Sequence, residues 1–330
     1  MEECPVLIAF SAWNIYNDTE SIIERTENHM KEPWTPPEIT GAIPHGDMPG
    51  DKICIDEGHI QKARVLFPAL REMIEARSGR TVVAVCGGSG VGKSEIASVL
   101  AYYLNDAGLG AYVLSGDNYP RRIPRDNDLE RLRVYRQGGL RGLVAAGCVT
   151  PEVTASLRAL WTADRDADPA AADADAWLSV YQRAGRRALT DYLGTPAETD
   201  FDEVSGILAA FHQGAAEIPL KRMGREPSEL WYDRVDFSAV RVLIVEWTHG
   251  NSDYLEGVDL PILLNSTPAE TLAHRRARNR DGKTDSAFTS LVLAIEQQKL
   301  EAQAWKARLI LSKQGQLLSY ADYRRLMAEA

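Results

Sequence analysis

The stretch Thr81-Val-Val-Ala-Val-Cys86, continued by Gly87-Gly-Ser-Gly-Val-Gly-Lys-Ser94, decides the fold of this 330-residue chain. Its first part is largely apolar and rich in β-branched residues, which predicts a buried strand. Its second part fits the pattern G-x-x-x-x-G-K-[ST], in which backbone N–H groups surround phosphates, the lysine reaches the β and γ oxygens and the serine binds Mg²⁺. A helix predicted from Lys93 to about Asn105 would point the positive end of its dipole at the same phosphates.

We therefore predict a binding site for ATP and Mg²⁺, with Ser94 as a metal ligand and Lys93 as a catalytic cation. A chance glycine-rich turn is the alternative, and it is disfavoured because a strand precedes the loop and a helix follows it. The residues predicted to bind the nucleotide are Gly87, Gly88, Ser89, Gly90, Val91, Gly92, Lys93 and Ser94.

Other strand and helix patterns predict an α/β fold, with a parallel sheet flanked by helices as in P-loop NTPases. Residues 1–56 mix Pro, Gly and aromatic residues and predict a loop-rich extension, and residues 57–330 form the predicted kinase domain. Residues 119–190 of this domain predict a helical insertion, in which the Asp/Ala tract 164–175 is expected to be solvated. Further strands are predicted at 111–115, 240–245, 260–264 and 308–311, and helices at 57–76, 268–279 and 286–299.

The composition limits the partners and the compartment of the chain. A formal net charge of -10 argues against binding to nucleic acid or to an anionic membrane surface, since both depend on clustered Lys and Arg. The four cysteines lack metal-site spacing, and Cys86 falls in an apolar strand pattern, which indicates reduced thiols and a cytoplasmic location. The acidic start and the absence of an apolar run near the roughly 20 residues of a membrane helix predict no membrane span and no export.

Two acidic residues follow predicted strands and are candidates for catalysis. Asp117 lies just after the strand 111–115, and Glu246 ends the strand 240–245. Carboxyl ends of parallel strands share one crevice, so both side chains should face the P-loop. Phosphoryl transfer needs one carboxylate to accept the proton of the acceptor hydroxyl and another to help hold the metal. A turn role for Asp117 and a strand-end ion pair for Glu246 are the alternatives.

A cluster of basic residues belongs to the predicted helix 268–279 and the segment after it. Arg276 and Arg280, four residues apart, share one helical face, and Arg275 and Arg278 share another. Guanidinium groups over a transferring phosphoryl group would stabilise its charge, whereas a solvated basic face is the alternative. A local basic cluster in an acidic chain favours an anion-binding role.

The order of these motifs resembles that of the uridine kinase and phosphoribulokinase-like P-loop kinases. The resemblance covers about 81–118 and 192–311, and four stretches carry it: 87–94, Ser115-Gly-Asp117, Val242-Leu-Ile-Val-Glu246 and 267–276. It implies that Asp117 is the general base near Mg²⁺, that Ser94 and Glu246 belong to the metal site, and that Arg276 and Arg280 belong to a mobile lid at 275–288. It also implies that the strand 216–223 lines the acceptor pocket and that the helical insertion lies on the acceptor side.

Departures from this family bear on the acceptor. Gly194 stands where uridine kinases have an aspartate for ribose, Lys221 and Met223 take aromatic base-binding positions, and Trp247 follows Glu246 where the family has glycine. A Trp face beside hydrogen-bonding side chains suits a polyhydroxylated ligand, so the predicted acceptor is a sugar. The residues predicted to bind it are Lys221, Arg222, Trp247 and His249.

The segment Val245-Glu-Trp-Thr-His-Gly-Asn251 is similar to the sucrose kinase part of the bifunctional α-galactosidase/sucrose kinases, which makes sucrose a candidate acceptor. Two alternatives stay open. The first is an adenylylsulfate or nucleoside kinase, because Leu114-Ser-Gly-Asp-Asn118 followed by Arg121 resembles the adenylylsulfate kinases. A nucleotide-binding regulator without kinase activity is the other, although Asp117 and Glu246 count against it. Oligomeric state is not predicted.

Overall fold

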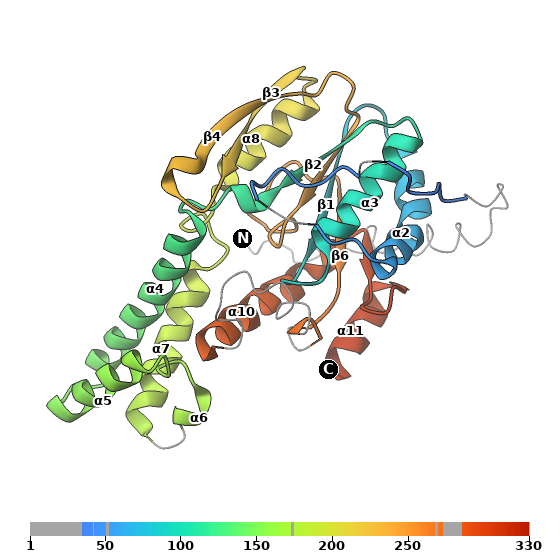
Figure 1. The fold of residues 1–330 in the computed structure, drawn as a ribbon. Coiled ribbons are helices and arrows are strands. Elements are labelled where there is room, and N and C mark those ends of the chain that lie inside the picture. The colour runs from blue at the N-terminus through green and yellow to red at the C-terminus, as the bar shows by residue number, and fades with distance from the viewer. Residues whose placement is uncertain are drawn as a thin grey trace, which may run out of the picture.

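The computed structural model describes residues 35–41, 43–50, 53–172, 175–267, 270–272 and 286–329 (Figure 1). Its centre is a mostly parallel sheet with strand order β2-β5-β1-β6-β7-β8, in which only β8 runs antiparallel to its neighbour. Because the parallel strands share a direction, their carboxyl ends lie along one edge, and the P-loop leaves β1 there. The bounds are β1 Thr81–Gly87, β2 Ala111–Ser115, β5 Val242–Glu246, β6 Leu260–Leu264, β7 Leu309–Leu311 and β8 Leu317–Leu318.

Helices cover both faces of this sheet, as strand periodicity requires. Side chains of β1 alternate between faces, so Val83 and Val85 pack under α2 (Glu57–Glu75) and α3 (Lys93–Asp106), whereas Val82 packs towards α8 (Phe201–His212) on the other face. The second face is completed by α10 (Ala287–Gln303), η3 (Ala304–Lys306) and α11 (Tyr320–Glu329). Burial on both faces explains why the strands read as continuous apolar runs.

A separate antiparallel hairpin lies beside the end of β2. Its strands are β3 (Glu217–Met223) and β4 (Leu230–Asp236), joined through η2 (Pro227–Glu229), and α8 packs against β3. The backbone N–H of Met223 donates a 2.9 Å hydrogen bond to Asn118 Oδ1 in the short helix η1 (Gly116–Asn118). The hairpin is therefore joined to the turn that carries Asp117.

Four helices form an arm that projects away from the sheet (Figure 1). The long helices α4 (Pro124–Ala145) and α7 (Ala176–Tyr192) run side by side, and α5 (Pro151–Thr162) and α6 (Pro169–Ala172) lie at the far end. The arm has its own apolar core, which includes Tyr135, Leu157, Leu178 and Tyr181.

The arm has a closed neck where the chain enters and leaves it. Pro120 and Thr199 form an isolated antiparallel bridge. Two backbone hydrogen bonds of 2.9 Å flank this bridge, from the Arg121 N–H to the Glu198 carbonyl and from the Asp200 N–H to the Tyr119 carbonyl. The two ends of the arm are thus joined to each other as well as to the sheet domain.

The predicted elements largely match the observed ones, and two expectations differ. The tract 164–175 was expected to be solvated, but Asp166 is buried because it accepts hydrogen bonds from Tyr181 and Arg136 inside the arm. The helices α8 and α11 and the strands β4 and β8 were not predicted. The predicted helix 268–279 lies largely outside the described residues, as do residues 1–34 of the extension. None of the described helices combines the length and apolar character needed to span a bilayer.

Candidate active site

The P-loop connects β1 to α3 at the carboxyl edge of the sheet. Gly92 occupies the N-cap of α3 with φ 95°, and no side chain caps the helix there. The first N–H groups of α3 are therefore directed at the loop without a side-chain acceptor, as an anion-binding helix end requires. The Lys93 ammonium donates a 3.2 Å hydrogen bond to the Gly88 carbonyl and folds back across the loop. The structure thus places the predicted phosphate-binding residues in the expected strand–loop–helix arrangement.

Glu246 lies at the end of β5 and contacts hydroxyl groups on both sides. Ser94 donates to Oε2 at 3.1 Å, and Ser115 donates to Oε1 at 2.7 Å. Burial and, to a smaller extent, the negative charge of Asp117 raise the pKa of Glu246 to about 7, against the opposing effects of Lys93 and the two serine hydroxyls. The carboxylate is 4% exposed. Among the described residues no Lys, Arg or His side chain forms an ion pair with Glu246. A metal cation would therefore stabilise its ionised form.

Asp117 lies in η1, directly after β2, and its side chain is exposed. The effect of its charge on the pKa of Glu246 shows that the two carboxylates share one electrostatic environment. The predicted convergence of β2 and β5 is thus observed: Ser115 pairs with Glu246 in register, and Asp117 follows two residues later. Asp117 is exposed, whereas Glu246 is buried.

These oxygen atoms fit a magnesium ion that also binds phosphate. Mg²⁺ takes oxygen ligands and is usually held by one or two carboxylates together with substrate phosphates and water. Ser94, Glu246 and Asp117 supply that donor set. Among the described residues, no three His, Cys, Asp or Glu side chains converge to hold a metal by themselves. A Mg²⁺ ion at this place would therefore depend on ATP for part of its coordination.

Asp47, in the extension before α2, was missed from the sequence. Its Oδ1 accepts 2.9 Å hydrogen bonds from the Ser115 N–H and from Asn118 Nδ2. Its Oδ2 accepts from the Tyr112 hydroxyl at 2.9 Å and from Arg222 Nη1 at 2.7 Å. Burial raises the pKa of Asp47, and the Arg222 charge opposes this. One carboxylate thus joins β2, η1 and the hairpin on either side of Asp117.

The residue before Asp47 lies against the carboxylate of Glu246. Gly46 is buried, and a Cβ atom on it would lie 3.4 Å from both Glu246 Oε1 and the Ser115 Cβ. The segment around Gly46 and Asp47 therefore covers the end of β5. A single Asp in a Pro-rich segment gives no periodic signal, so only the fold brings it to the site.

The predicted acceptor residues Lys221 and Arg222 lie in β3, and carboxylates pair with both. Lys221 Nζ is 3.0 Å from Glu203 Oε2 and lies over the Tyr119 ring. Arg222 contacts Asp47, and its Nε is 3.1 Å from Asp233 Oδ2. Both side chains are buried. Their contact with an acceptor stays a prediction, and the structure shows that their charges are largely neutralised by neighbours.

Trp247 and His249 follow β5 and pack against the arm's neck and α8. The Trp247 indole is 3% exposed, lies 5.1 Å from the Phe201 ring centroid and covers Gly116 so closely that a Cβ there would lie 2.0 Å from the indole. The predicted stacking of Trp247 on a sugar would need this ring to be uncovered. His249 contacts Gly194, and burial lowers the pKa of His249 to about 4, with Glu198 opposing the shift.

Arg276 and Arg280, with the rest of the segment 273–285, lie outside the described residues. Their predicted role in a lid therefore stays a prediction. Two described residues near the P-loop were missed from the sequence, Arg131 in α4 and Glu296 in α10. Lys93 and Asp117 both influence the pKa of Glu296, which burial raises.

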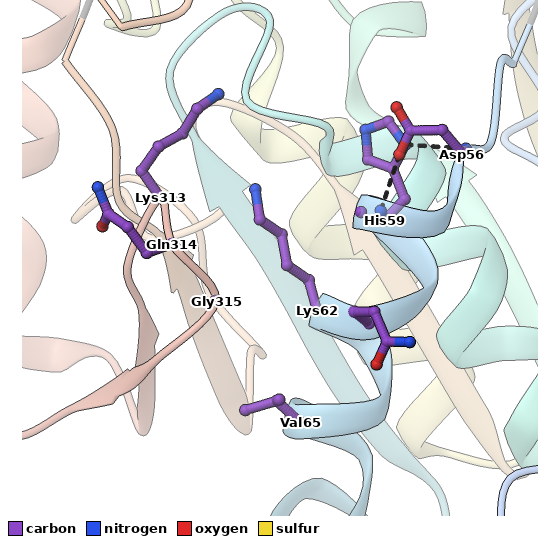
Figure 2. Close-up of a pocket in the computed structure, with 9 residues that line it drawn as sticks. Asp56, His59, Lys62, Val65, Lys313, Gln314 and Gly315 are labelled. Carbon is purple, nitrogen blue, oxygen red and sulfur yellow. Dashed lines mark hydrogen bonds and ion pairs between the residues drawn. The ribbon is translucent and has the colours of Figure 1, made fainter.

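A cleft of about 430 Å³ lies on the other side of the P-loop, between α2 and the turn that joins β7 to β8 (Figure 2). The His59 ring lies at the edge of the P-loop, because a Cβ on Gly92 would be 2.8 Å from it. Figure 2 shows the Lys62 and Lys313 side chains extending on opposite sides of this cleft. Burial lowers the pKa of Lys62, and the charge of Lys313 lowers it further. The cleft is therefore cationic and adjoins the phosphate-binding loop.

Comparison with known proteins agrees with the resemblance expected from the sequence. No protein-family model matches the chain. The chain is 41% identical over 258 residues, 78% of its length, to the bifunctional α-galactosidase/sucrose kinase AgaSK of Mediterraneibacter gnavus, and the match spans 23% of that protein.

Solved structures give weaker likenesses. A Silicibacter sp. TM1040 protein described as a fructose transport system kinase aligns over 74% of this chain and 94% of its own, with 19% identity and a TM-score of 0.44. A possible uridine kinase from Bacillus stearothermophilus aligns over 64% and 90%, with 13% identity and a TM-score of 0.36. At these scores neither likeness bears on the acceptor. Over most of its length the chain is a relative of one part of a bifunctional α-galactosidase/sucrose kinase.

Proposed function

We propose that this chain is an ATP-dependent kinase that transfers the γ-phosphoryl group to a hydroxyl of a sugar, with sucrose as the first candidate acceptor. The observation that carries the proposal is the hydrogen bond between Ser94 of the P-loop and Glu246 at the end of β5. It joins a phosphate-binding loop to a buried carboxylate, with Asp117 beside them on the open side. The identity with a protein named a sucrose kinase supports a sugar as the acceptor.

In the proposed reaction the acceptor oxygen bonds to the γ-phosphorus while the bond from that phosphorus to the β,γ-bridging oxygen breaks and ADP is released. Asp117 receives the proton of the acceptor hydroxyl, and Lys93 neutralises charge on the β and γ oxygens. Ser94 and Glu246 would hold Mg²⁺, which when bound neutralises phosphate charge.

The cleft between α2 and the β7–β8 turn is the proposed place for the nucleoside end of ATP. It adjoins Gly92, so a nucleotide whose phosphates lie in the P-loop can extend into it. Its volume of about 430 Å³ is within the range of small-molecule sites. The predicted consequence is that Gln314→Ala raises the KM for ATP and leaves the acceptor KM unchanged.

The proposal is tested by ADP release from Mg²⁺-ATP with separate acceptors: sucrose, glucose, fructose, uridine, adenylylsulfate, pantothenate and none. Sugar-dependent release that is lost in Lys93→Ala, with an unchanged melting temperature, is the expected result. Lys306→Ala is the matched control, because Lys306 pairs with Asp253 away from the P-loop. Release dependent on uridine or adenylylsulfate would instead support the nucleoside or adenylylsulfate kinases, and ATP binding without any turnover would support a regulator.

A further inference from the structure

A set of charged side chains lies at the base of the arm, beyond the residues assigned to ATP and Mg²⁺. Its centre is Arg131 of α4, whose Nε donates a hydrogen bond to Glu198 Oε1 near the arm's neck. Glu198 also accepts from the Gly194 N–H and, at 3.2 Å, from Asn127 Nδ2. Its side chain is 1% exposed. Glu198 is therefore fully engaged, and it holds the Arg131 guanidinium in one orientation.

Glu296 of α10 lies near another nitrogen of the same guanidinium. Arg131 Nη2 and Glu296 Oε1 are 3.8 Å apart, close enough for an ion pair and too far for a hydrogen bond. The exposed Asp128 lies 3.6 Å from Arg131 Nη1. Within the described part of the chain Glu296 makes no hydrogen bond, and its side chain is 12% exposed. The Arg131 guanidinium and the Glu296 carboxylate thus lie side by side without a hydrogen bond between them, so both can still bond to a ligand.

Glu296, one member of this pair, lies beside the P-loop. Glu296 lines a small hollow together with Gly88 and Ser89 of the P-loop. Burial raises the pKa of Glu296 most, Arg131 and Lys93 lower it, and Glu198 and Asp117 raise it. The charges of Lys93 and Asp117 thus both act on Glu296. Glu296 therefore lies beside the phosphate-binding loop, which an acceptor of the γ-phosphoryl group must approach.

We propose that Arg131 and Glu296 bind neighbouring hydroxyls of the acceptor, with the guanidinium donating to one oxygen and the carboxylate accepting from the next. A hydroxyl both donates and accepts, so vicinal hydroxyls of a sugar match a donor and an acceptor side by side. This inference rests on the proposed function and extends it to the class of acceptor.

The charge of the set selects for an uncharged acceptor. Two cations, Arg131 and Lys93, and two other carboxylates, Glu198 and Asp117, act on Glu296, so the negative charge of Glu296 itself is left uncompensated. A phosphorylated or carboxylated acceptor would bring a further negative charge into this space, which is unfavourable at low dielectric. We therefore expect free sugars to be used and sugar phosphates to be rejected.

The test compares Glu296→Gln and Arg131→Lys with the wild type, using the best sugar from the acceptor panel. Each variant should raise the acceptor KM about 10- to 100-fold, because a charge-assisted hydrogen bond to a hydroxyl is lost, and should leave the ATP KM unchanged. Glu296→Gln should keep the melting temperature, whereas Arg131→Lys should lower it because the buried Glu198 loses the guanidinium hydrogen bond. Glu296→Gln should also improve use of the corresponding sugar monophosphate relative to the free sugar. The controls are Glu301→Gln on α10 and Arg133→Lys on α4, whose side chains pair with Gln297 and Glu130.

The outcomes separate the two proposals. If the wild type phosphorylates a sugar and both variants keep its acceptor KM, Arg131 and Glu296 do not bind the acceptor, and the kinase assignment stands. If Glu296→Gln leaves the preference between free and phosphorylated sugar unchanged, the charge argument is wrong. If the wild type phosphorylates no sugar, the proposed function is overturned together with this inference.

Discussion

Ser115 and Glu246 face each other across the neighbouring strands β2 and β5, and the Ser115 hydroxyl donates a 2.7 Å hydrogen bond to the Glu246 carboxylate. The other oxygen of the carboxylate accepts from Ser94. Two neutral hydroxyls thus donate the hydrogen bonds that water molecules would donate to an exposed carboxylate. They do not supply positive charge, so the buried group holds a proton more tightly than usual.

The first prediction concerns stability against pH. Because the pKa of Glu246 is raised from 4.5 to about 7 in the folded protein, its contribution to stability is fully present below pH 4.5 and is lost as pH rises through about 7. In buffer without Mg²⁺, the wild type should lose about 3 kcal/mol relative to Glu246→Gln across that window. Urea denaturation at a series of pH values measures this difference. The exposed Glu256 supplies the control Glu256→Gln, which should follow the wild type. A wild-type profile that runs parallel to that of Glu246→Gln would contradict the prediction.

The second prediction concerns the general base. Asp117→Asn should lower kcat on the order of 10²- to 10⁴-fold and affect ATP affinity less, because the amide cannot accept the hydroxyl proton. Steady-state kinetics with saturating ATP measure the change. Asp126, a partly exposed residue of the first turn of α4, gives the control Asp126→Asn. A loss confined to the acceptor KM would show that Asp117 binds the acceptor and does not accept its proton.

The third prediction concerns the extension. Asp47→Ala should cost about 3 kcal/mol of unfolding free energy, because it leaves the buried Arg222 with the exposed Asp233 as its charged partner. It should also lower kcat, since the Ser115 N–H and Asn118 lose the carboxylate that fixes the turn around Asp117. Asp233→Ala removes the exposed partner of Arg222 and should cost less than about 1 kcal/mol. Equal costs for the two variants would show that Asp47 is not the main partner.

The fourth prediction concerns Trp247. Its ring is enclosed by Gly116 and Phe201, so Trp247→Ala should cost about 3–5 kcal/mol through the cavity that it leaves. Kinetics should therefore be measured on Trp247→Phe, which retains an apolar ring. If the indole contacts the sugar, Trp247→Phe weakens sugar use more than ATP binding. If the indole only packs against Gly116, Trp247→Phe lowers kcat and leaves the acceptor KM constant.

The sheet could be predicted from the sequence because its strands are buried on both faces and their apolar runs end at turn residues. The strand 111–115 was predicted to the residue, and β5 and β7 differ from their predictions by one or two residues. The same physics explains why Asp117 and Glu246 could be predicted to converge, since residues that follow parallel strands share an edge. The strand β4 was missed because its residues are mostly exposed and its alternating pattern is weak.

The other half of the candidate site could not be predicted, because it depends on contacts between residues far apart in the chain. Asp47 reaches Arg222 across 175 positions, and Arg131 meets Glu198 across 67. Charged residues in a loop or on a helix surface look alike in sequence whether they are solvated or buried against a partner. The packing of Trp247 was equally hidden: an aromatic residue beside a carboxylate suggested a binding face, and nothing in the sequence indicates that the ring packs on Gly116 and Phe201.

The hydrogen-bonded neck between Pro120 and Thr199 gives the arm the properties of an exchangeable cassette. A segment that begins and ends at paired neighbours can be lengthened, trimmed or replaced over evolutionary time without moving the strands on either side. This cassette carries Arg131 and Glu198 within it, whereas Lys93, Ser94 and Glu246 belong to the sheet domain. Changes of acceptor could therefore arise by insertion or replacement within one segment, while the machinery for ATP is inherited intact.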